Sequence, residues 1–529
     1  MKLLSQLGWI SLVCLLACAQ DTTIQEQQIL NKSVGKTPIM GWSSWNHFHT
    51  NIDQRLIKET AEAMVSSGMA DAGYQYVNID DGYFGFRDRQ NRLHAHEHKF
   101  PDGMKAISDY IHELGLKAGI YSEAGRHTCA TKWDNDDHGF FAGMYGYEEQ
   151  DMSLMLNEWG YDFIKVDYCD GFWKKMDEKK RYTAISEAIT KTNKEVVFNV
   201  CRWTFPGTWV KGLADSWRIS ADIKPTFESI CSIIDTAAYL AQYAEPGNFN
   251  DMDMLQVGRG MTYEEDKAHF SMWCIMASPL LSGNDLRKMS QKTIDILTNE
   301  EVIAINQDVA GIQAQKVYDQ GDLELWVKPL GGRQSPTRAI AMFNRSDKPH
   351  TMTVTWQQAG IAGKAMVRDL WDHTDRGVFE NEYTALVPSH GIVLVQVDAE
   401  NSTVPSSYEA EYAYMNLYHV TDMADYVLNE NASGGAVAVA VGGHEDNWIE
   451  WQHVYVPNDG NYMVELELIG QVEVAIEVVV NEGDAQILKT KKPPAMQVYL
   501  KKGYNKIRIN NKEEVLPPID KINILKQQV

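Results

Sequence analysis

The chain has 529 residues, of which 44% are hydrophobic and 23% charged. This length and composition suffice for the cores of roughly two to four domains. Its 72 acidic residues exceed the 49 basic ones and give a formal net charge of -23. Proteins that bind nucleic acid need a basic surface, so this balance excludes that class, and it also disfavours a polyanionic substrate.

The N-terminus has the features of a targeting segment. Residues 7–17 form an apolar stretch that is too short to span a bilayer, and we expect residues 1–19 to be a signal peptide. The segment LLAC resembles a bacterial lipobox, which would place a lipid anchor on Cys18, whereas the overlapping ACA fits an ordinary signal peptidase site. Both alternatives predict a secreted protein, either in a bacterial periplasm or held on the outer membrane as a lipoprotein.

Short apolar runs alternate with amphipathic helical patterns through the first half of the chain. We expect strands at 74–81, 116–125, 161–171, 194–203, 217–223 and 248–255, and helices at 102–115, 151–160 and 177–192. Such alternation predicts parallel βαβ units. Its repetition over this length fits a (β/α)8 TIM barrel of the α/β class better than an open sheet.

The pattern changes after residue 312. Apolar and polar residues alternate in LELWVKPL, TMTVTW and GIVLVQV, and again in YMVELELIG and YNKIRINN nearer the C-terminus. Period-two alternation is typical of antiparallel strands with one buried face, so we expect two successive β-sandwiches. The predicted order is a tether at 20–35, the barrel at 36–312, a small antiparallel β-sandwich domain at 313–399, a linker at 400–407 and a second β-sandwich at 408–529.

Nearly every predicted barrel strand ends in a charged residue or a tyrosine. In a TIM barrel these ends meet on one face, where the active site is built. Asp167 ends one such strand, and Lys165 lies two residues before it on the same side. A nearby ammonium lowers the pKa of a carboxylate and keeps it ionised, as a nucleophile requires. A structural ion pair is the alternative interpretation of this segment alone.

A second strand end carries Asp222, with Arg218 four residues before it. Cleavage of a glycosidic bond uses two carboxyl groups in different ionisation states, and two strand-end acids of one barrel can supply them. The separation of the two groups decides whether the reaction retains or inverts the anomeric configuration, and the sequence does not give that distance.

Asp80 and Asp81 are adjacent acids at the end of another strand. They could bind a divalent metal, but no further acidic or histidine-rich cluster accompanies them. Hydrogen bonds to sugar hydroxyls are the favoured interpretation, since an ionised carboxylate is a pure acceptor. Trp42, Trp45 and Tyr121 lie near these strand ends and are candidates for stacking on a sugar ring.

The five cysteines outside the signal segment are Cys129, Cys169, Cys201, Cys231 and Cys274. None forms a CxxC pair, which argues against a zinc site. An oxidising compartment permits a disulfide, but the count alone does not say which cysteines pair.

Eight segments of the chain occur in the order seen in one enzyme family: PIMGWSSWN, YVNIDDGY, GLKAGIYSEAG, TCA, FIKVDYC, SWRISADI, NDMDML and VIAINQD. Residues 36–398 resemble glycoside hydrolase family 27, which contains retaining α-galactosidases and α-N-acetylgalactosaminidases. The resemblance implies that Asp167 is the nucleophile and Asp222 the acid/base of an enzyme that needs no cofactor for catalysis. It also implies substrate contacts at Trp45, Asp80, Asp81, Tyr121, Lys165, Arg218 and Asp253.

Two further implications come from the same resemblance. Asp80 and Asp81 would hold the 4- and 6-hydroxyls of the sugar, and Lys165 the 3- and 4-hydroxyls. Cys129 and Cys169 occupy the positions of the family's disulfide near the active site.

One position departs from the family pattern. Relatives carry Glu in a CEW motif that contacts the 2-position of the sugar, whereas this chain has CRW with Arg202, which only donates hydrogen bonds. The contact of Arg202 with substrate must therefore differ. β-L-Arabinopyranosidase and isomaltose-releasing dextranase activities remain alternatives with the same mechanism, although the acid pair at 80–81 favours the hydroxymethyl group of galactose. An inactive glycan-binding lipoprotein is disfavoured because both catalytic aspartates are present.

The C-terminal segments YEAEYA, ASGG, GYNKIRINN and IDKINI resemble carbohydrate-binding modules of families 6 and 35. That resemblance implies a structural calcium site with oxygen ligands from Glu409, Glu411 and Asp520. The alternative is a spacer domain without affinity for sugar. The expected partners are therefore a carbohydrate substrate and, through the lipid anchor alone, a membrane.

Overall fold

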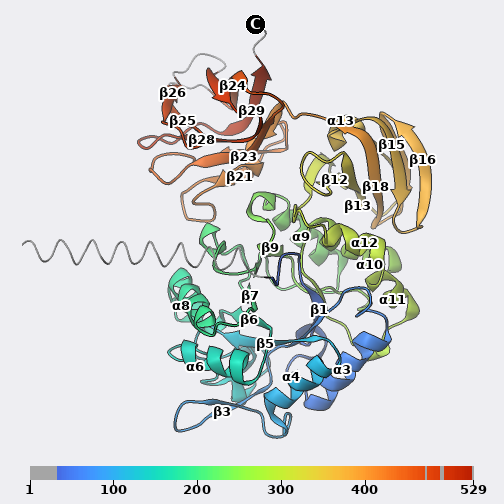
Figure 1. Cartoon of the computed structure of the whole chain (residues 1–529), viewed down its shortest axis with the longest axis vertical. Helices are drawn as coiled ribbons and strands as arrows, with labels where there is room; N and C mark the ends of the chain where they lie inside the picture. Colours follow the sequence, from blue (N-terminus) through green and yellow to red (C-terminus); the bar gives the residue numbers. More distant parts are fainter. Residues whose placement is uncertain (1–32, 471–473, 489–493, 527–529) are drawn as a thin grey trace, which may run out of the picture.

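The computed structural model describes residues 33–470, 474–488 and 494–526, which form one large N-terminal domain and two β-rich domains (Figure 1). The predicted signal peptide, the anchor at Cys18 and most of the tether lie outside the described residues. In the part of the chain that is described, no helix combines the length and the apolar character of a membrane span.

The N-terminal domain is a TIM barrel, so the predicted fold class is confirmed. Eight parallel strands pair in the order β10-β1-β2-β5-β6-β7-β8-β9. A parallel bridge between Leu255 and Ser282 closes the barrel between β9 and β10. The strands are β1 (Met40–Ser43), β2 (Tyr76–Ile79), β5 (Lys117–Glu123), β6 (Phe163–Asp167), β7 (Val197–Val200), β8 (Ser216–Arg218), β9 (Phe249–Asp251) and β10 (Leu280–Ser282). A hairpin of β3 (Phe84–Arg87) and β4 (Leu93–Ala95) follows β2.

An outer layer of helices surrounds the barrel and buries the outer faces of its strands (Figure 1). They are α3 (Gln54–Ser66), α4 (Gly103–Glu113), α6 (Glu148–Met152), α8 (Glu178–Lys191), α9 (Phe227–Ala237), α10 (Tyr263–Ile275), α11 (Gln291–Leu297) and α12 (Glu300–Asn306). The helix expected at 151–160 begins earlier, at Glu148. Its first part is α6, which continues directly into a π-helix over Ser153–Glu158. The short helices α2 (Trp45–Phe48), α5 (Ala130–Trp133) and α7 (Cys169–Trp173) follow the carboxyl ends of β1, β5 and β6.

The barrel strands are shorter than the pattern predicts, and two of them are absent from the predicted set. β1 has four residues and β10 has three. They are as short as the predicted strands β2, β8 and β9, but no charged residue or tyrosine directly follows either of them. The strand expected at 161–171 ends at Asp167, and α7 begins two residues later. The strand-end acids therefore lie where each strand gives way to a loop on one face of the barrel.

The second domain is an antiparallel β-sandwich. A six-stranded sheet in the order β11-β12-β13-β18-β15-β16 packs against the pair β14–β17. Ile340 and Val395 of the large sheet share one apolar core with Val354 of the small one. The strands are β11 (Gln315–Gln320), β12 (Leu323–Pro329), β13 (Thr337–Asn344), β14 (His350–Thr355), β15 (Ile361–Asp369), β16 (Thr374–Glu380), β17 (Glu382–Val387) and β18 (Gly391–Ser402), with helix α13 at Trp356–Ala359.

The third domain, called the C-terminal module below, is a second β-sandwich. The sheet β21-β22-β29-β24-β27, with β19 added beside β29, faces the sheet β20-β23-β28-β25-β26. The strands are β19 (Ser407–Glu409), β20 (Tyr414–Met415), β21 (Asp425–Leu428), β22 (Ala436–Val439), β23 (Ile449–Val456), β24 (Gly460–Leu468), β25 (Ile476–Val480), β26 (Gln486–Leu488), β27 (Ala495–Leu500), β28 (Gly503–Asn510) and β29 (Ile519–Lys526).

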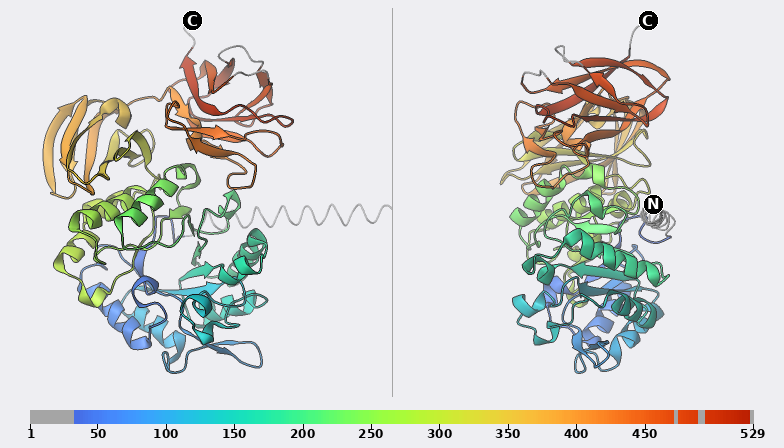
Figure 2. Two further views of the ribbon diagram at one scale, coloured as in Figure 1. Left: turned by 180° about the vertical axis from the view of Figure 1, so that it is seen from behind. Right: turned by 90° about the vertical axis from the view of Figure 1, so that its left-hand side faces the viewer.

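The C-terminal module rests on the barrel, as both views of Figure 2 show. The rings of Tyr418 in the module and Tyr243 in the barrel stack at 5.4 Å, and the Tyr243 hydroxyl donates to the backbone carbonyl of Met415. The buried apolar residues of the module and of the barrel form one continuous cluster. The module is therefore docked through an apolar contact rather than joined only by its linker.

Candidate active site

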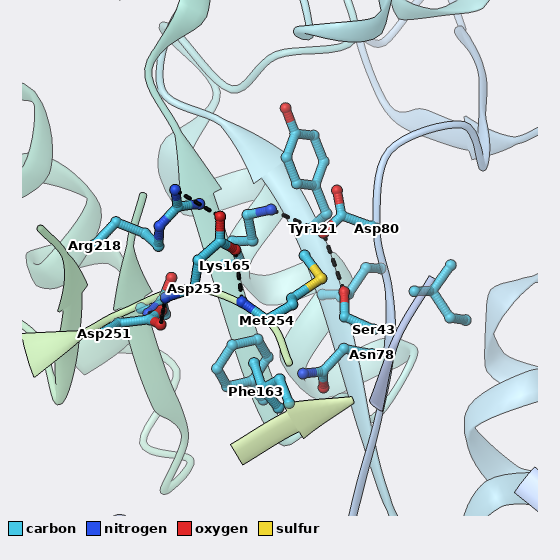
Figure 3. A pocket seen from close by; sticks show the side chains of 14 residues that line it. Ser43, Asn78, Asp80, Tyr121, Phe163, Lys165, Arg218, Asp251, Asp253 and Met254 are labelled. Atoms are coloured by element: carbon cyan, nitrogen blue, oxygen red, sulfur yellow. Dashed lines mark hydrogen bonds and ion pairs between the residues drawn. The ribbon is translucent and has the colours of Figure 1, made fainter. Parts of the chain in front are cut away.

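A pocket with a volume of about 440 Å³ lies at the carboxyl ends of the barrel strands and is open to solvent. Figure 3 shows the floor below it, where acidic and basic side chains of several strands converge. Nine of the ten predicted substrate and catalytic residues line the pocket, and these are Trp45, Asp80, Asp81, Tyr121, Lys165, Asp167, Arg218, Asp222 and Asp253. The strand-end positions thus bring together side chains that are far apart in the sequence.

Asp167 is the last residue of β6 and is buried. Its Oδ1 accepts a hydrogen bond from the backbone N–H of Tyr168 at 3.0 Å. The pKa of the Asp167 carboxyl is raised to about 6, mainly because burial leaves the ionised form poorly solvated. The charge of Lys165 opposes this rise, and the charge of Asp222 adds to it. Within the described residues, no Lys or Arg forms an ion pair with Asp167, so its carboxylate is not occupied by a cation.

Lys165 takes a different partner from the one that its spacing in the sequence suggests. Its Nζ lies 2.9 Å from Oδ2 of Asp80 (Figure 3). Burial lowers the pKa of the ammonium, but the negative charges of Asp80 and Asp167 outweigh burial and raise the pKa of Lys165 well above its usual value. The charge of Lys165 does lower the Asp167 pKa, as expected, although burial outweighs it. The alternative interpretation, a direct ion pair between Lys165 and Asp167, is wrong, because the ammonium pairs with Asp80. β2 and β6 are not neighbours in the sheet, so Lys165 reaches Asp80 across the barrel interior.

Arg218 links two acids of the pocket. Its Nη2 lies 3.0 Å from Oδ1 of Asp222 and 2.8 Å from Oδ2 of Asp253, and the side chains of Arg218 and Asp253 are each 4% exposed. Burial disfavours the guanidinium charge, but the two acids raise the pKa of Arg218 well above its usual value and keep it protonated. The side chain of Asp222 is 66% exposed. Arg218 therefore orients Asp222 and leaves its carboxylate open to a ligand and to water.

Asp80 and Asp81 have different environments although they are adjacent. Asp80 bonds to Lys165 and accepts a hydrogen bond from the Ser43 hydroxyl. Asp81 accepts the backbone N–H of Ala130 at 2.9 Å, and burial raises the pKa of its carboxyl to about 7. Asp81 thus also holds the first residue of α5 beside the pocket.

The structure contains the disulfide between Cys129 and Cys169, with their Cα atoms 5.3 Å apart. Among the described residues, one group of acids and cysteines has ligand atoms close enough together for a metal ion. It consists of these two cysteines, Glu123 and Asp167. A disulfide offers no thiolate, so this group lacks the ligands of a metal site. Asp80 and Asp81 are not part of it.

The aromatic candidates divide into pocket and core. Trp45 and Tyr121 line the pocket, and the buried Tyr121 hydroxyl has no hydrogen-bond partner within the described part of the chain. Trp42 is fully buried, and its Nε1 donates to the carbonyl of Asn284. The expectation that Trp42 stacks on a ligand is therefore wrong, because its neighbours in the barrel core enclose it.

Of the ten predicted catalytic and substrate residues, Arg202 is the one that does not line the pocket. Its Nε lies 2.8 Å from Oε2 of Glu178 in α8, and its guanidinium lies over the rings of Tyr168, Phe172 and Trp203 at 5.4, 5.5 and 5.7 Å. The ion pair and the rings hold Arg202 beside the pocket.

Glu123 is a buried acid that the sequence interpretation missed. It ends β5 and lies opposite Asp167 in the register of β5 and β6. Its carboxylate accepts the backbone N–H groups of Gly125 and Cys169, each at 2.9 Å, and burial followed by the charge of Asp167 raises its pKa well above the usual range. Glu123 therefore fixes the turn that follows Asp167. The signal that could have identified Glu123 as a site residue is its position at the end of a strand, in IYSEAG.

Five more lining residues, Asn46, Trp133, Cys201, Trp203 and Met254, were also missed. Trp133 ends α5 and Trp203 follows β7, so both lie in loops where no periodic pattern marks them. Met254 follows the predicted Asp253 directly in NDMDML.

Comparison with known proteins identifies the family. A model described as "Alpha galactosidase A" matches residues 37–308, and one described as "Alpha galactosidase C-terminal beta sandwich domain" matches residues 320–397. The chain belongs to the α-galactosidase family, glycoside hydrolase family 27. It is a glycoside hydrolase of the α-galactosidase type, and this family needs no cofactor for catalysis.

Relatives within and near this family cover most of the first two domains. Alpha-galactosidase A of Cellvibrio japonicus is 40% identical over 421 residues, which are 75% of this chain and 98% of that protein. The crystal structure of α-galactosidase I from Mortierella vinacea matches with a TM-score of 0.66 and 35% identity, over 70% of this chain and 100% of that one. A family 27 β-L-arabinopyranosidase from Geobacillus stearothermophilus matches with a TM-score of 0.61 and 25% identity, over 69% of this chain and 97% of that one.

Proposed function

We propose that the protein is a retaining exo-α-galactosidase that releases terminal α-D-galactosyl residues from oligo- or polysaccharides. The observation that carries the proposal is that the buried carboxylate of Asp167 and the exposed carboxylate of Asp222 line the same pocket. The barrel floor closes the pocket from below, which suits the end of a sugar chain rather than its middle.

In the first step, the Asp167 carboxylate attacks the anomeric carbon and forms a covalent glycosyl-enzyme. Asp222 donates its proton to the glycosidic oxygen, so that the leaving group departs as a neutral alcohol. The positions of the two acids support these roles. Asp167 is buried beside the sugar site, whereas Asp222 lies at the open side, where a leaving group must pass.

In the second step, Asp222 acts as a base. It takes a proton from the water that attacks the anomeric carbon, and Asp167 is released as a carboxylate. The exposure of Asp222 supports this role because water can reach it without a conformational change. Two displacements at the same carbon retain the anomeric configuration.

The floor of the pocket supports galactose as the sugar that it binds. The Asp80–Lys165 pair offers an acceptor and a donor for vicinal hydroxyls, and Asp81 offers a further acceptor. The unpartnered hydroxyl of Tyr121 adds another polar group at the same place. Arg202 is paired with Glu178, which leaves the 2-position of the sugar without a contact from Arg202.

Another sugar with the same mechanism is the alternative. An arabinopyranose ring lacks the hydroxymethyl group that Asp80 and Asp81 would contact. The higher identity to an α-galactosidase than to the β-L-arabinopyranosidase also favours galactose.

Asp167→Asn tests the proposal, with aryl α-galactoside, β-L-arabinopyranoside, α-N-acetylgalactosaminide and α-glucoside as substrates. We expect the wild-type protein to hydrolyse the α-galactoside fastest. Asp167→Asn should reduce kcat by at least about 10³-fold while the protein still folds, because an amide is not a nucleophile at carbon. Undiminished hydrolysis by the variant would contradict the mechanism, and a faster reaction with another glycoside would contradict the choice of sugar.

The proposal includes the location of the enzyme and the limits of its domains. The apolar stretch at 7–17 supports secretion, and the LLAC segment supports a lipid anchor at Cys18 on a bacterial outer membrane. The catalytic barrel would span 36–312, the β-sandwich domain 313–399 and the C-terminal module 408–529.

The C-terminal module would act as a carbohydrate-binding module stabilised by calcium. Glu411 is fully buried, and neither of its carboxylate oxygens has a hydrogen-bond partner within the described residues. The Ser433 hydroxyl donates to Glu409 and lies 3.3 Å from Asp520. Although the three carboxylates do not share one point, an uncompensated buried carboxylate beside two others is the chemistry that a calcium ion satisfies. Glu409, Glu411 and Asp520 would hold the ion.

A further inference from the structure

Aromatic side chains that follow three successive barrel strands lie at the mouth of the pocket or next to it. Trp133 ends α5 after β5, Phe172 lies in α7 after β6, and Trp203 follows β7. Trp133 and Trp203 line the pocket itself. Trp133 is 63% exposed and Phe172 is 52% exposed. Exposed aromatic rings at the edge of a polar pocket are costly to leave in water, which points to a ligand that covers them.

The aromatic rim is held in a fixed arrangement. The disulfide between Cys129 and Cys169 joins the start of α5 to the start of α7. On the same two helices, Nζ of Lys132 lies 3.9 Å from the centre of the Trp173 ring. The carboxylate of Asp134, which follows α5, accepts the backbone N–H of Thr50. These bonds limit the movement of Trp133, so its exposure is a built feature and not that of a loose loop.

The side of the rim formed by Trp203 is also held. Arg202 packs its guanidinium against the rings of Phe172 and Trp203, and Glu178 fixes it by an ion pair. On the other side of Trp203, the Thr204 hydroxyl lies 3.0 Å from Nε2 of His419 in the C-terminal module.

The C-terminal module braces the same loop at two further points. Phe205 packs against Tyr418 with ring centres 5.4 Å apart, and the Thr208 hydroxyl donates to the carbonyl of Asn416 at 2.6 Å. The module therefore supports the loop that carries Trp203, in addition to any sugar that it binds itself.

We propose that Trp133 and Trp203 form the subsite for the leaving group, and that its occupant is a pyranose sugar stacked on these rings. The inference rests on the proposed function, because the occupant is the sugar that the cleaved bond links to galactose. Asp222, which would protonate the leaving oxygen, lines the same mouth and is exposed there. Lys132, whose Nζ lies 5.6 Å from the centre of the Trp133 ring, and the exposed carboxylate of Asp222 are charged groups at this mouth. Such groups suit the hydroxyl edge of a sugar better than an apolar aglycone.

Two leaving groups distinguish this subsite from the galactose pocket. α-Galactosyl fluoride loses a single atom, whereas an α-1,6-linked galactosyl oligosaccharide must place a sugar at the rim. Trp133→Ala should lower kcat/KM for the oligosaccharide by about tenfold or more, and change kcat/KM for the fluoride and inhibition by galactose less than twofold. The measurement is steady-state kinetics of both substrates with the full chain.

Tyr499→Ala is the matched control, because Tyr499 is 58% exposed in β27 of the module and lies outside the pocket lining. It should leave both substrates unchanged. His419→Ala should lower kcat/KM for the oligosaccharide and spare the fluoride, since it removes one brace of the Trp203 loop.

Equal losses on both substrates in Trp133→Ala, or no loss on either, would overturn the leaving-group subsite. If the wild-type protein does not hydrolyse α-galactosyl fluoride, the proposed function itself fails, and that result is separate from the effect of the rim.

Discussion

At Asp167, opposing electrostatic effects set the ionisation of the proposed nucleophile. Burial raises the pKa of the carboxyl, and the charge of Lys165 lowers it without a direct bond between the two groups. The result, a pKa of about 6, leaves Asp167 ionised at neutral pH and more basic than an exposed aspartate. Asp222 acts in the opposite sense to Lys165, because its negative charge raises the pKa of Asp167.

The raised pKa predicts an acid limit for activity. As pH falls through about 6, Asp167 becomes protonated and can no longer attack, whereas an unshifted aspartate would remain ionised down to about pH 4. We expect kcat/KM for α-galactosyl fluoride to fall about tenfold per pH unit below pH ~6. The fluoride needs no acid for departure, so its pH profile reports the nucleophile.

Asp222→Asn provides the control for this profile. Loss of its charge removes one cause of the raised pKa, so the acid limit should move to lower pH when first-step hydrolysis of the fluoride is followed. A wild-type profile that stays flat down to pH 4.5 would contradict a raised pKa at Asp167, and an unmoved limit in the variant would contradict the coupling with Asp222.

The sequence predicts which residues stand at the site better than it predicts their partners. Strand ends in a barrel are recognisable, and Asp80, Asp167 and Asp222 all lie in the pocket. The partner of Lys165 depends on how non-neighbouring strands face each other across the barrel, and spacing along one strand carries no such information. For the same reason, Trp42 and Trp45 look alike in the sequence, yet one lies in the core and the other in the pocket.

Short elements carry much of the pocket, and several of them are elements that patterns miss. β1 and β10 complete the barrel with four and three residues. α5 and α7 have four and five residues and carry Trp133 and Phe172. Helices of this length are not stable by themselves, so tertiary bonds must hold them. The disulfide between Cys129 and Cys169 is one such bond.

Removal of that disulfide should affect the rim before the galactose pocket. We expect the double variant Cys129→Ser, Cys169→Ser to lose about 2–4 kcal/mol of unfolding free energy. Because α5 and α7 are then joined less firmly, kcat/KM for the oligosaccharide should fall more than that for the fluoride. Urea denaturation and kinetics of the two substrates measure the two effects.

Cys231→Ser serves as the matched control, since Cys231 is a free, partly buried cysteine in α9. It should change neither the unfolding free energy nor the ratio of the two kcat/KM values appreciably. A double variant whose activities on the two substrates fall equally would show that the disulfide does not serve the rim in particular.

At the scale of the whole molecule, the C-terminal module is packed on the catalytic barrel. It shares an apolar cluster with the barrel and contacts the loop that carries Trp203. The two ends of the pocket are thus supported differently, the galactose side by the barrel strands and the leaving-group side by loops, a disulfide and a second domain. Loss of order in the module should therefore impair oligosaccharides more than substrates with a small leaving group.

Calcium offers a direct test of that dependence. Binding of calcium would satisfy the unpartnered carboxylate of Glu411, so titration of CaCl2 into protein freed of metal with EGTA should raise the unfolding temperature of the module by several degrees. Removal of the ion should lower kcat/KM for the oligosaccharide and spare the fluoride, because the barrel floor is unchanged. Glu411→Ala should abolish the calcium response in calorimetry, whereas Glu482→Gln, at an exposed acid that follows β25 in the same module, should keep it. An unfolding temperature that is indifferent to calcium in the wild-type protein would refute the site, and an oligosaccharide activity that survives a destabilised module would refute its role at the rim.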